Sequence, residues 1–339
     1  MEIRDDILDD RERIGFRLRE LYHSHGFSRY RMGKFEEYDL YSRNKDFLLS
    51  DGVITFTDTN GRLMALKPDV TLSIVKNIRD RGEGLEKLYY CENVYRVSEG
   101  ADGFREETQV GIECMGRIGK RTIGEVLEMA AESLGALDEK WVLEVSHLDL
   151  LSAMVDGVAL DGDMRDRILR CAGEKNPHGI SEICREAGLR AGAEEALLTL
   201  LSVYGPPRQV MPAVRKLAEE NGCGAYAREL GEIVAAFAGT DAADKIWIDF
   251  SATGDPKYYN GIAFKGFIEG IPDPVLSGGQ YDALMRRMHR KDRAVGFAVF
   301  LNRLDGLAEA YPASGESVSR AQSSGSEPLG RKEKEAGDE

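Results

Sequence analysis

KLYYCENVYRVSEGADGFREETQVGIECMG, residues 87–116, predicts a β-hairpin around which the rest of the chain is organised. Its strands are expected over 88–91 and 109–115, and a polar, glycine-containing loop over 98–107 joins them. Such a loop is longer than a tight turn, and loops of this kind often carry binding residues. The hairpin is therefore a candidate for the centre of both fold and function.

The second strand of this hairpin has one polar face. Gln109, Gly111 and Glu113 alternate along it with apolar side chains, Val110, Ile112 and Cys114. Successive strand residues point to opposite faces, and a buried amide or carboxylate without hydrogen bonds is costly. Two interpretations stay open for this strand. Either other side chains satisfy Gln109 and Glu113, or a small polar ligand does.

Composition narrows the classes of function. The chain has 339 residues and a net charge of −14, which argues against general nucleic-acid binding because phosphates attract surplus Lys and Arg. The acidity favours a small-molecule ligand or a protein partner. No apolar run reaches the length of a membrane span, and the first residues do not form a signal peptide. The five cysteines are scattered and form no CxxC pair, which indicates reduced thiols, a cytoplasmic protein and no metal site.

The N-terminal part of the chain alternates helices and hairpins. Helices are predicted over 9–26 and 70–78, with a hairpin over 53–66 that turns at Asn60-Gly61, a pair that tolerates positive φ. Asp69 stands where that hairpin leads into the second helix, so its carboxylate either caps the helix or faces a pocket. After the central hairpin we expect helix 122–134, strand 141–146 and helix 148–155.

Residues 161–237 show only helical patterning and are predicted to form a helical insertion between strand-rich regions. Strands are expected again over 245–250, 261–267, 274–276 and 294–300, with helices over 282–288 and 302–311. Residues 277–282, SGGQYD, are predicted as a glycine-rich turn that could cradle a phosphate, although they lack the spacing of known phosphate-binding loops. Residues 313–339 are rich in Ser, Gly, Glu and Lys and predict a disordered tail.

Four segments in this order resemble the catalytic domain of class II aminoacyl-tRNA synthetases of the histidyl type, over roughly residues 5–312. They are LKPDVT (66–71), VYR (94–96) with TQVGIE (108–113), KYYNG (257–261) with SGGQYD (277–282), and GFAVFLNRL (296–304). The resemblance implies an α+β fold in which helices flank an antiparallel sheet, and usually a homodimer. A single synthetase-like domain, 1–312, would thus contain the insertion 161–237.

The resemblance also implies a pocket for free histidine. In the synthetase pattern the α-amino group lies near the residues matching Asp69, Thr71 and Gln109, and the imidazole near those matching Glu113 and Tyr259. Arg96 belongs to the segment resembling motif 2, and Tyr258 to the histidine-specific segment. The chemistry agrees, since an ammonium group and an imidazole N–H need carboxylate, hydroxyl or amide acceptors.

This chain departs from the synthetase pattern where activation chemistry is performed. Gly254 stands at the position of the catalytic arginine, and glycine cannot stabilise charge on the reacting groups. Lys257 is the candidate replacement. Phe300 replaces the glycine beside the adenine and Asn302 the following acid, although Arg303 remains. Too few residues follow for an anticodon-binding domain, which needs about 100 residues.

These departures resemble the family of synthetase paralogues that serve as regulatory subunits of ATP phosphoribosyltransferase, the first enzyme of histidine biosynthesis. The resemblance implies a subunit without catalytic residues or cofactors, forming a homodimer within a hetero-oligomer with a short catalytic subunit. L-histidine would be its ligand and feedback effector, and neither a membrane nor tRNA is expected as a partner. Two alternatives stay open: a truncated histidyl-tRNA synthetase-like enzyme that activates an amino acid with ATP, and a free-standing histidine sensor.

Overall fold

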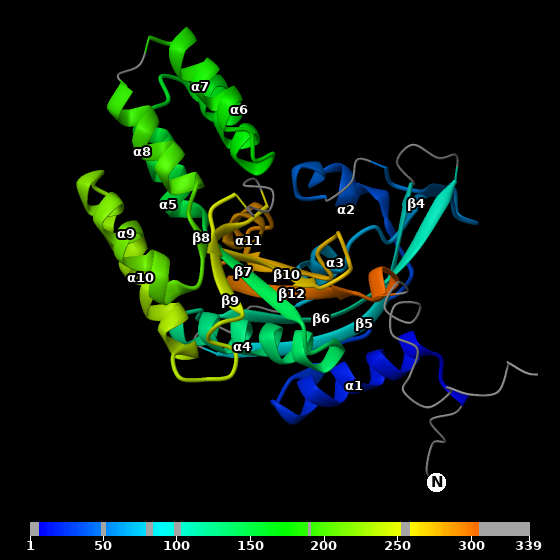
Figure 1. The fold of residues 1–339 in the computed structure, drawn as a ribbon. Coiled ribbons are helices and arrows are strands. Elements are labelled where there is room, and N and C mark those ends of the chain that lie inside the picture. The colour runs from blue at the N-terminus through cyan, green and yellow to red at the C-terminus, as the bar shows by residue number, and fades with distance from the viewer. Residues whose placement is uncertain are drawn as a thin grey trace, which may run out of the picture.

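The computed structural model describes residues 7–48, 52–78, 84–97, 103–188, 191–251 and 258–304. These residues form an α+β fold in which helices cover a large central sheet (Figure 1). The helices are α1 (Asp10–Ser24), α2 (Tyr38–Ser42), α3 (Val70–Asn77), α4 (Lys120–Leu137), α5 (Leu148–Asp156), α6 (Gly162–Gly173), α7 (Pro177–Glu186), α8 (Ala191–Leu201), α9 (Pro207–Glu220), α10 (Gly224–Val234) and α11 (Asp282–Arg287). Short 3₁₀ turns are η2 (Lys45–Phe47), η3 (Ala235–Phe237) and η4 (Leu301–Leu304).

The strands form one nine-stranded and one three-stranded sheet. They are β1 (Ser28–Arg29), β2 (Phe35–Glu37), β3 (Thr55–Thr57), β4 (Leu63–Leu66), β5 (Leu85–Val97), β6 (Phe104–Gly116), β7 (Trp141–His147), β8 (Tyr204–Gly205), β9 (Ile246–Asp249), β10 (Asn260–Ile268), β11 (Leu276–Gln280) and β12 (Arg293–Phe300). The large sheet has the order β1-β5-β6-β12-β11-β10-β7-β9-β8, and the small one β2-β4-β3. Two pairs, β1–β5 and β7–β9, are parallel, so the expected antiparallel sheet is in fact mixed.

One face of the large sheet packs against α1 and α4. The apolar residues of β6 belong to the same buried cluster as Leu18 of α1 and Leu127 of α4, both fully buried. Helix α4 enters this layer through side chains at helical spacing, Ile123, Val126, Leu127, Ala130 and Leu134. The predicted alternation along β6 is thereby confirmed. Its apolar side chains face these helices, which leaves Gln109 and Glu113 on the opposite face.

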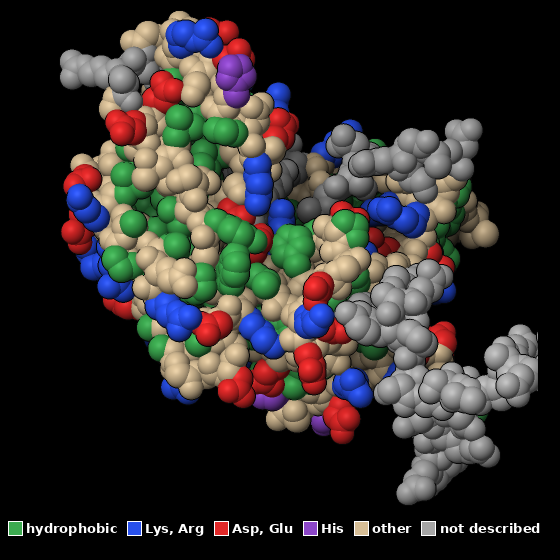
Figure 2. Space-filling model, viewed as in Figure 1, with side chains coloured by type: hydrophobic (Ala, Val, Ile, Leu, Met, Phe, Trp, Pro, Cys, Tyr) green, Lys and Arg blue, Asp and Glu red, His purple; other side chains and the backbone are tan. Residues whose placement is uncertain are grey.

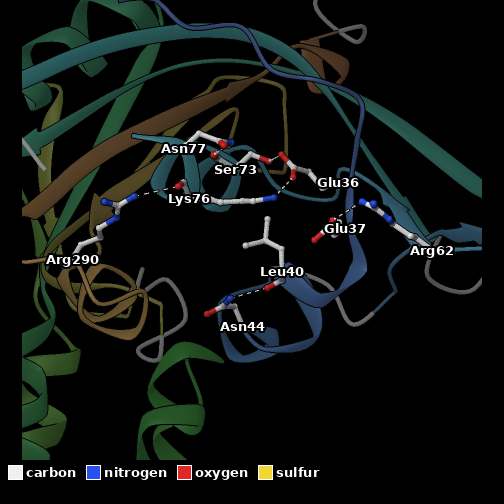
Figure 3. Close-up of polar contacts among 9 residues, drawn as sticks. All are labelled: Glu36, Glu37, Leu40, Asn44, Arg62, Ser73, Lys76, Asn77 and Arg290. Carbon is white, nitrogen blue, oxygen red and sulfur yellow. Dashed lines mark hydrogen bonds and ion pairs between the residues drawn. The ribbon is translucent and has the colours of Figure 1, made fainter. Parts of the chain in front are cut away.

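The three-stranded sheet and α2, α3 and α11 lie on that opposite face, around a second buried cluster (Figure 1). Glu36 of β2 ties α3 to the small sheet, because it accepts hydrogen bonds from Ser73 Oγ at 3.1 Å and Lys76 Nζ at 2.7 Å (Figure 3). Arg290 Nη2 donates to the Val75 carbonyl oxygen at 3.0 Å near the C-terminus of α3. The contacts from Glu36 and Arg290 thus hold the second half of α3 in place. The first turn of this helix lies at the candidate site.

The central hairpin is longer than predicted. Strands β5 and β6 pair from Leu85–Gly116 to Val97–Phe104, so residues 104–107, expected in the loop, belong to β6. The loop prediction was wrong there because β12 pairs with β6 only over Gln109–Gly116. Between Gln109 and Phe104 the hairpin continues as a two-stranded ribbon without β12. The exposed faces of such a ribbon accept polar residues, whose sequence resembles that of a loop.

The prediction of a glycine-rich turn was also wrong over residues 277–280, because these residues form part of β11 in the middle of the sheet. A Cβ atom on Gly278 would lie 2.6 Å from Phe264 Cζ, and one on Gly279 would lie 2.7 Å from Tyr259 Cδ1. The glycines therefore make room for neighbouring aromatic rings, which a turn prediction from local sequence cannot detect. Helix α11 follows as predicted.

The helical block agrees with the expected helices, α6 to α10, except that the short strand β8 interrupts it and extends the edge of the large sheet beside β9. The boundaries 1–312 and 161–237 remain predictions. Of the predicted helix 302–311, the structure describes the η4 turn, and the predicted tail 313–339 lies outside the described residues. Within the described parts of the chain, no helix has the length and apolar character needed to cross a membrane.

Candidate functional site

A cavity with about 420 Å³ of empty space opens on the polar face of β6, where the strand meets the first turn of α3. Six of the seven predicted ligand-binding residues line it, namely Asp69, Thr71, Gln109, Glu113, Tyr258 and Tyr259. Sequence reasoning did not assign six further lining residues to the site, namely Tyr90, Ser277, Tyr281, Gly296, Phe297 and Ala298. The site thus draws on α3, the central hairpin and the last strands of the sheet.

Glu113 is the most enclosed acid of this cavity. Its side chain accepts hydrogen bonds from Thr71 Oγ1 at 2.7 Å and from the Tyr281 hydroxyl. The pKa of Glu113 is raised to about 8, because burial and, to a smaller extent, the charge of Asp69 outweigh the lowering effect of the two hydroxyl donors. The carboxyl group is therefore poised to ionise when a cationic ligand arrives.

Asp69 satisfies both interpretations of its position. It is the N-cap of α3 and accepts a hydrogen bond from the Leu72 backbone N–H at 2.8 Å through Oδ1. The same side chain lines the cavity, and burial raises its pKa against the lowering influence of the Leu72 bond and of Arg96. One carboxylate can fill both roles because it has two oxygens with several acceptor positions.

The aromatic wall depends on the glycines of neighbouring strands. Tyr90 of β5 stands opposite Gly111 of β6, where a Cβ atom would lie 2.6 Å from the tyrosine hydroxyl oxygen. Tyr258 and Tyr259 pack edge to face with ring centroids 4.7 Å apart. Burial raises the pKa of both phenols, so they stay protonated and can donate as well as accept. Tyr90 thus occupies the space that the missing side chain of Gly111 leaves on this strand.

Gln109 and Arg96 are connected through Glu107. Gln109 Nε2 donates to Glu107 Oε1 at 2.7 Å, and Arg96 Nη1 lies 3.9 Å from the same oxygen. Arg96 also donates from Nε to the Pro68 carbonyl oxygen at 3.3 Å, directly before Asp69. Arg96 is the one predicted residue that does not line the cavity. It supports the backbone that carries Asp69.

Phe300 lines the cavity together with Ala298. The guanidinium carbon of Arg303 lies 4.2 Å from the centroid of the Phe300 ring, and Arg303 Nη1 donates to the Pro274 carbonyl oxygen. Arg303, which this chain keeps from the synthetase pattern, therefore contacts an aromatic ring and a backbone carbonyl. Gly254 and Lys257 lie outside the described residues, and the described side chains include no His, Cys, Asp or Glu group able to hold a metal.

This arrangement suits a small ligand that carries N–H donors and positive charge. Two buried carboxyl groups, four phenols and an amide line one cavity. Such groups provide acceptors for an ammonium or imidazole N–H, and enclosure strengthens each of these interactions. Tyr90 lies on β5, which borders β6, whereas Tyr281 follows β11, which is separated from β6 by β12, so both could have been found only by knowing the strand order.

The sheet, the flanking helices and a polar cavity on the sheet face opposite α1 and α4 define a class II aminoacyl-tRNA synthetase-like protein. Residues 4–304 match the family model described as Histidyl-tRNA synthetase. The chain belongs to this family.

Two relatives similar in sequence to this chain are named ATP phosphoribosyltransferase regulatory subunit. The ATP phosphoribosyltransferase regulatory subunit of Alkaliphilus metalliredigens is 26% identical over 299 residues, which cover 87% of this chain and 76% of the relative. The protein of the same name from Clostridium kluyveri is 27% identical over 308 residues, covering 88% and 77%.

Solved structures agree on the fold. An ATP phosphoribosyltransferase regulatory subunit/histidyl-tRNA synthetase from Bacillus halodurans superposes with a TM-score of 0.78 at 24% identity, covering 89% of this chain and 80% of that one. The ATP phosphoribosyl transferase (HisG:HisZ) complex from Thermotoga maritima gives a TM-score of 0.66 at 18% identity, with 86% and 97% covered. The expected synthetase-like fold is thus confirmed.

Proposed function

We propose that this chain is a non-catalytic regulatory subunit of ATP phosphoribosyltransferase and takes part in the first step of histidine biosynthesis. The observation that carries the proposal is Phe300, which lines the cavity and stacks against Arg303 at 4.2 Å. The amino-acid side of a synthetase-like site is kept, while a bulky ring stands where the resemblance implies space for adenine. The names of relatives aligned along 87–88% of the chain support the same conclusion.

L-histidine is the proposed ligand of the cavity. Asp69 and Gln109 are assigned to its α-amino group, and Glu113 and Tyr259 to its imidazole. Thr71 acts on the imidazole side through its 2.7 Å hydrogen bond to Glu113. Each hydrogen bond to a charged group contributes about 1.5–3 kcal/mol, so a few such contacts make a specific amino-acid site.

The proposed partners are a short catalytic subunit and a second copy of this chain. A second copy is supported by the outward face of β2, β3 and β4, where Phe35 and Phe56 are 58% and 37% exposed and their rings lie 5.3 Å apart. Exposed aromatic pairs of this kind are favoured at interfaces. A cytoplasmic location agrees with the cysteines, none of which is in a disulfide.

Feedback by histidine would follow from two arrangements of the complex with unequal affinity for the ligand. A ligand shifts such an equilibrium only by its differential affinity for the two states. Thr71 of α3 and Glu113 of β6 both line the cavity and are hydrogen-bonded to each other, so histidine bound there would act on both elements. The state favoured by histidine is proposed to be the less active one.

The decisive experiment mixes this chain with the cognate catalytic subunit and measures ATP phosphoribosyltransferase activity with and without L-histidine. We expect a stable complex, activity that depends on this chain, and inhibition by histidine that Glu113→Gln relieves. The proposal is wrong if the two proteins neither associate nor change each other's activity.

Calorimetric titration of the isolated chain separates the alternatives. Binding of L-histidine without ATP supports the regulatory subunit. Binding of both, with histidine-dependent exchange of pyrophosphate into ATP, would instead support a truncated synthetase-like enzyme. If the chain binds histidine but does not associate with the catalytic subunit, a free-standing histidine sensor would be supported instead.

A further inference from the structure

A second cavity lies between the helical block and the edge of the large sheet. It has about 630 Å³ of empty space, part of which is open to solvent. Its walls come from α6, α7, α8, β8 and the end of β9, and it shares no lining residue with the cavity at Glu113. Hydrophobic side chains also gather on the visible surface over α8 and β8 (Figure 2).

Most of this second cavity is apolar. Aliphatic side chains of α7, of α8 and of the residue after it form the wall, namely Ile180, Leu198, Leu201 and Val203. Ile180 is fully buried, whereas the other three pack against the core but are only partly buried. The wall therefore presents apolar surface that a ligand of matching character would remove from water.

The polar end of the cavity is built around Asp249, whose side chain is 2% exposed. Its Oδ1 accepts from the Ser251 backbone N–H at 2.7 Å and from Ser251 Oγ at 2.5 Å, and its Oδ2 accepts from Lys175 Nζ at 3.0 Å. Three donors thus occupy most of the about four acceptor positions of this carboxylate. An amine from a ligand would have to compete with Lys175 and Ser251 for the remainder.

Lys175, by contrast, has donors to spare. Its ammonium group carries three N–H bonds, donates one to Asp249, and lies 5.6 Å from the centroid of the Tyr204 ring. Asn176 beside it accepts from the Gly179 N–H through Oδ1, which leaves its amide hydrogens available. The polar end is therefore rich in donors and poor in free acceptors.

The backbone at Lys175 sets the point from which this side chain starts, and the side chain itself is 61% exposed. Lys175 has φ of 53°, a left-handed conformation that glycine normally adopts at the end of a helix. Two hydrogen bonds fix the turn, from Lys175 N–H to the Ala172 carbonyl at 3.1 Å and from Asn176 N–H to the Cys171 carbonyl at 2.8 Å. A lysine here keeps a strained conformation and directs its charge across the cavity to β9.

The wider charge balance is compatible with one additional negative group. Two acids, Asp249 and Glu144, face two lysines, Lys175 and Lys265, and burial raises the pKa of Glu144 and lowers that of Lys265.

From these contacts we propose that the second cavity binds a small carboxylate with an apolar body. The carboxylate would accept hydrogen bonds from Lys175 and Asn176 beside the Tyr204 ring. The apolar body would lie against Ile180, Leu198 and Leu201. This site is independent of the histidine pocket and does not require the function proposed above.

The test uses the full chain and three probes of matched shape, phenylpropanoate, phenylpropanamide and phenylpropylamine. Calorimetry measures binding, and the fluorescence of Trp247 reports on it because that ring packs 4.7 Å from Tyr204. We expect the acid to bind at millimolar concentration or better, the amide more weakly and the amine not at all. Equal binding of the three probes, or no binding of the acid, overturns the proposal.

Substitution at Lys175 gives the second arm of the test. Lys175→Asn removes the charge but tolerates the left-handed backbone, so the fold is retained, which the melting temperature checks. Affinity for phenylpropanoate should fall about tenfold, the loss expected from one charged hydrogen bond, while L-histidine binding stays unchanged. Lys216→Asn, which removes an exposed ammonium 3.9 Å from Glu220 on α9, serves as the control and should bind like wild type. If Lys175→Asn binds phenylpropanoate as tightly as the wild type, the assignment of Lys175 to the carboxylate is wrong.

Discussion

Thr71 donates its hydroxyl to Glu113 at 2.7 Å and so joins the first turn of α3 to the centre of β6. These residues are 42 positions apart in the chain, and both are buried. The contact couples a helix that begins at the cavity to a strand that lines it. A ligand that attracts Glu113 must therefore also act on α3.

Glu113→Gln should weaken L-histidine binding at pH 7 by about tenfold or more, because a charged hydrogen bond contributes about 1.5–3 kcal/mol. The fold should persist, since the free protein already holds this side chain largely neutral and Gln has nearly the same shape. Calorimetry and thermal unfolding measure the two effects. Glu144→Gln, a buried carboxyl substitution outside the cavity, is the control. Equal losses of binding and thermal stability would make Glu113 a structural residue.

The stability of the unliganded protein should fall as pH rises from about 5 to 8. Glu113 has its pKa raised from 4.5 to about 8 by burial, so the native state retains a proton that the unfolded state releases. The stabilisation is complete below pH 4.5 and is lost as pH passes through the folded-state pKa. Urea unfolding at several pH values measures the slope. Glu113→Gln should flatten it, and an identical slope in the variant would contradict the assignment.

Gly278→Ala should destabilise the protein by about 1–3 kcal/mol, the usual cost of overpacking. Its new methyl group would lie 2.5 Å from the Gly296 carbonyl oxygen and 2.6 Å from Phe264 Cζ, inside the sheet. Gly124→Ala is the matched control, because nothing lies within 4 Å of its Cβ position in α4. That substitution should stabilise the protein by up to about 1 kcal/mol through helix propensity. Urea unfolding measures the free energy of unfolding of both variants. Changes of the same sign in the two variants would refute the packing argument.

Replacing Phe35 and Phe56 together with serine should convert a dimer of this chain into monomers. Both rings lie on the outward face of the small sheet, since Phe35 pairs with Leu66 and Phe56 with Met64 along β4. Sedimentation velocity measures the mass, and circular dichroism confirms that the fold is retained. Phe104→Ser removes a ring that is 74% exposed at the end of the central hairpin and should leave the dimer intact. A double variant that remains dimeric would place the interface elsewhere.

Local patterns predicted the parts of the fold that depend on near neighbours in sequence. The alternation around Glu113, the N-cap at Asp69 and the helix periodicity of α4 each appear as expected, because period and capping are properties of a few consecutive residues. The segments matching the synthetase family located most of the cavity. The hairpin ends and the glycines of β11 were misread, since both depend on which strands border them.

The sequence by itself determined the polar face of β6, the acid at the start of α3 and the departures at Phe300 and Gly254. Only the tertiary structure decided which groups meet. Tyr281 reaches Glu113 from 168 positions away, and Phe300 lies opposite Gln109 because β12 pairs with β6. The Lys175–Asp249 contact, 74 positions apart, likewise exists only because the helical block folds back on the sheet edge. Strand order and helix docking are long-range properties, and no window of consecutive residues contains them.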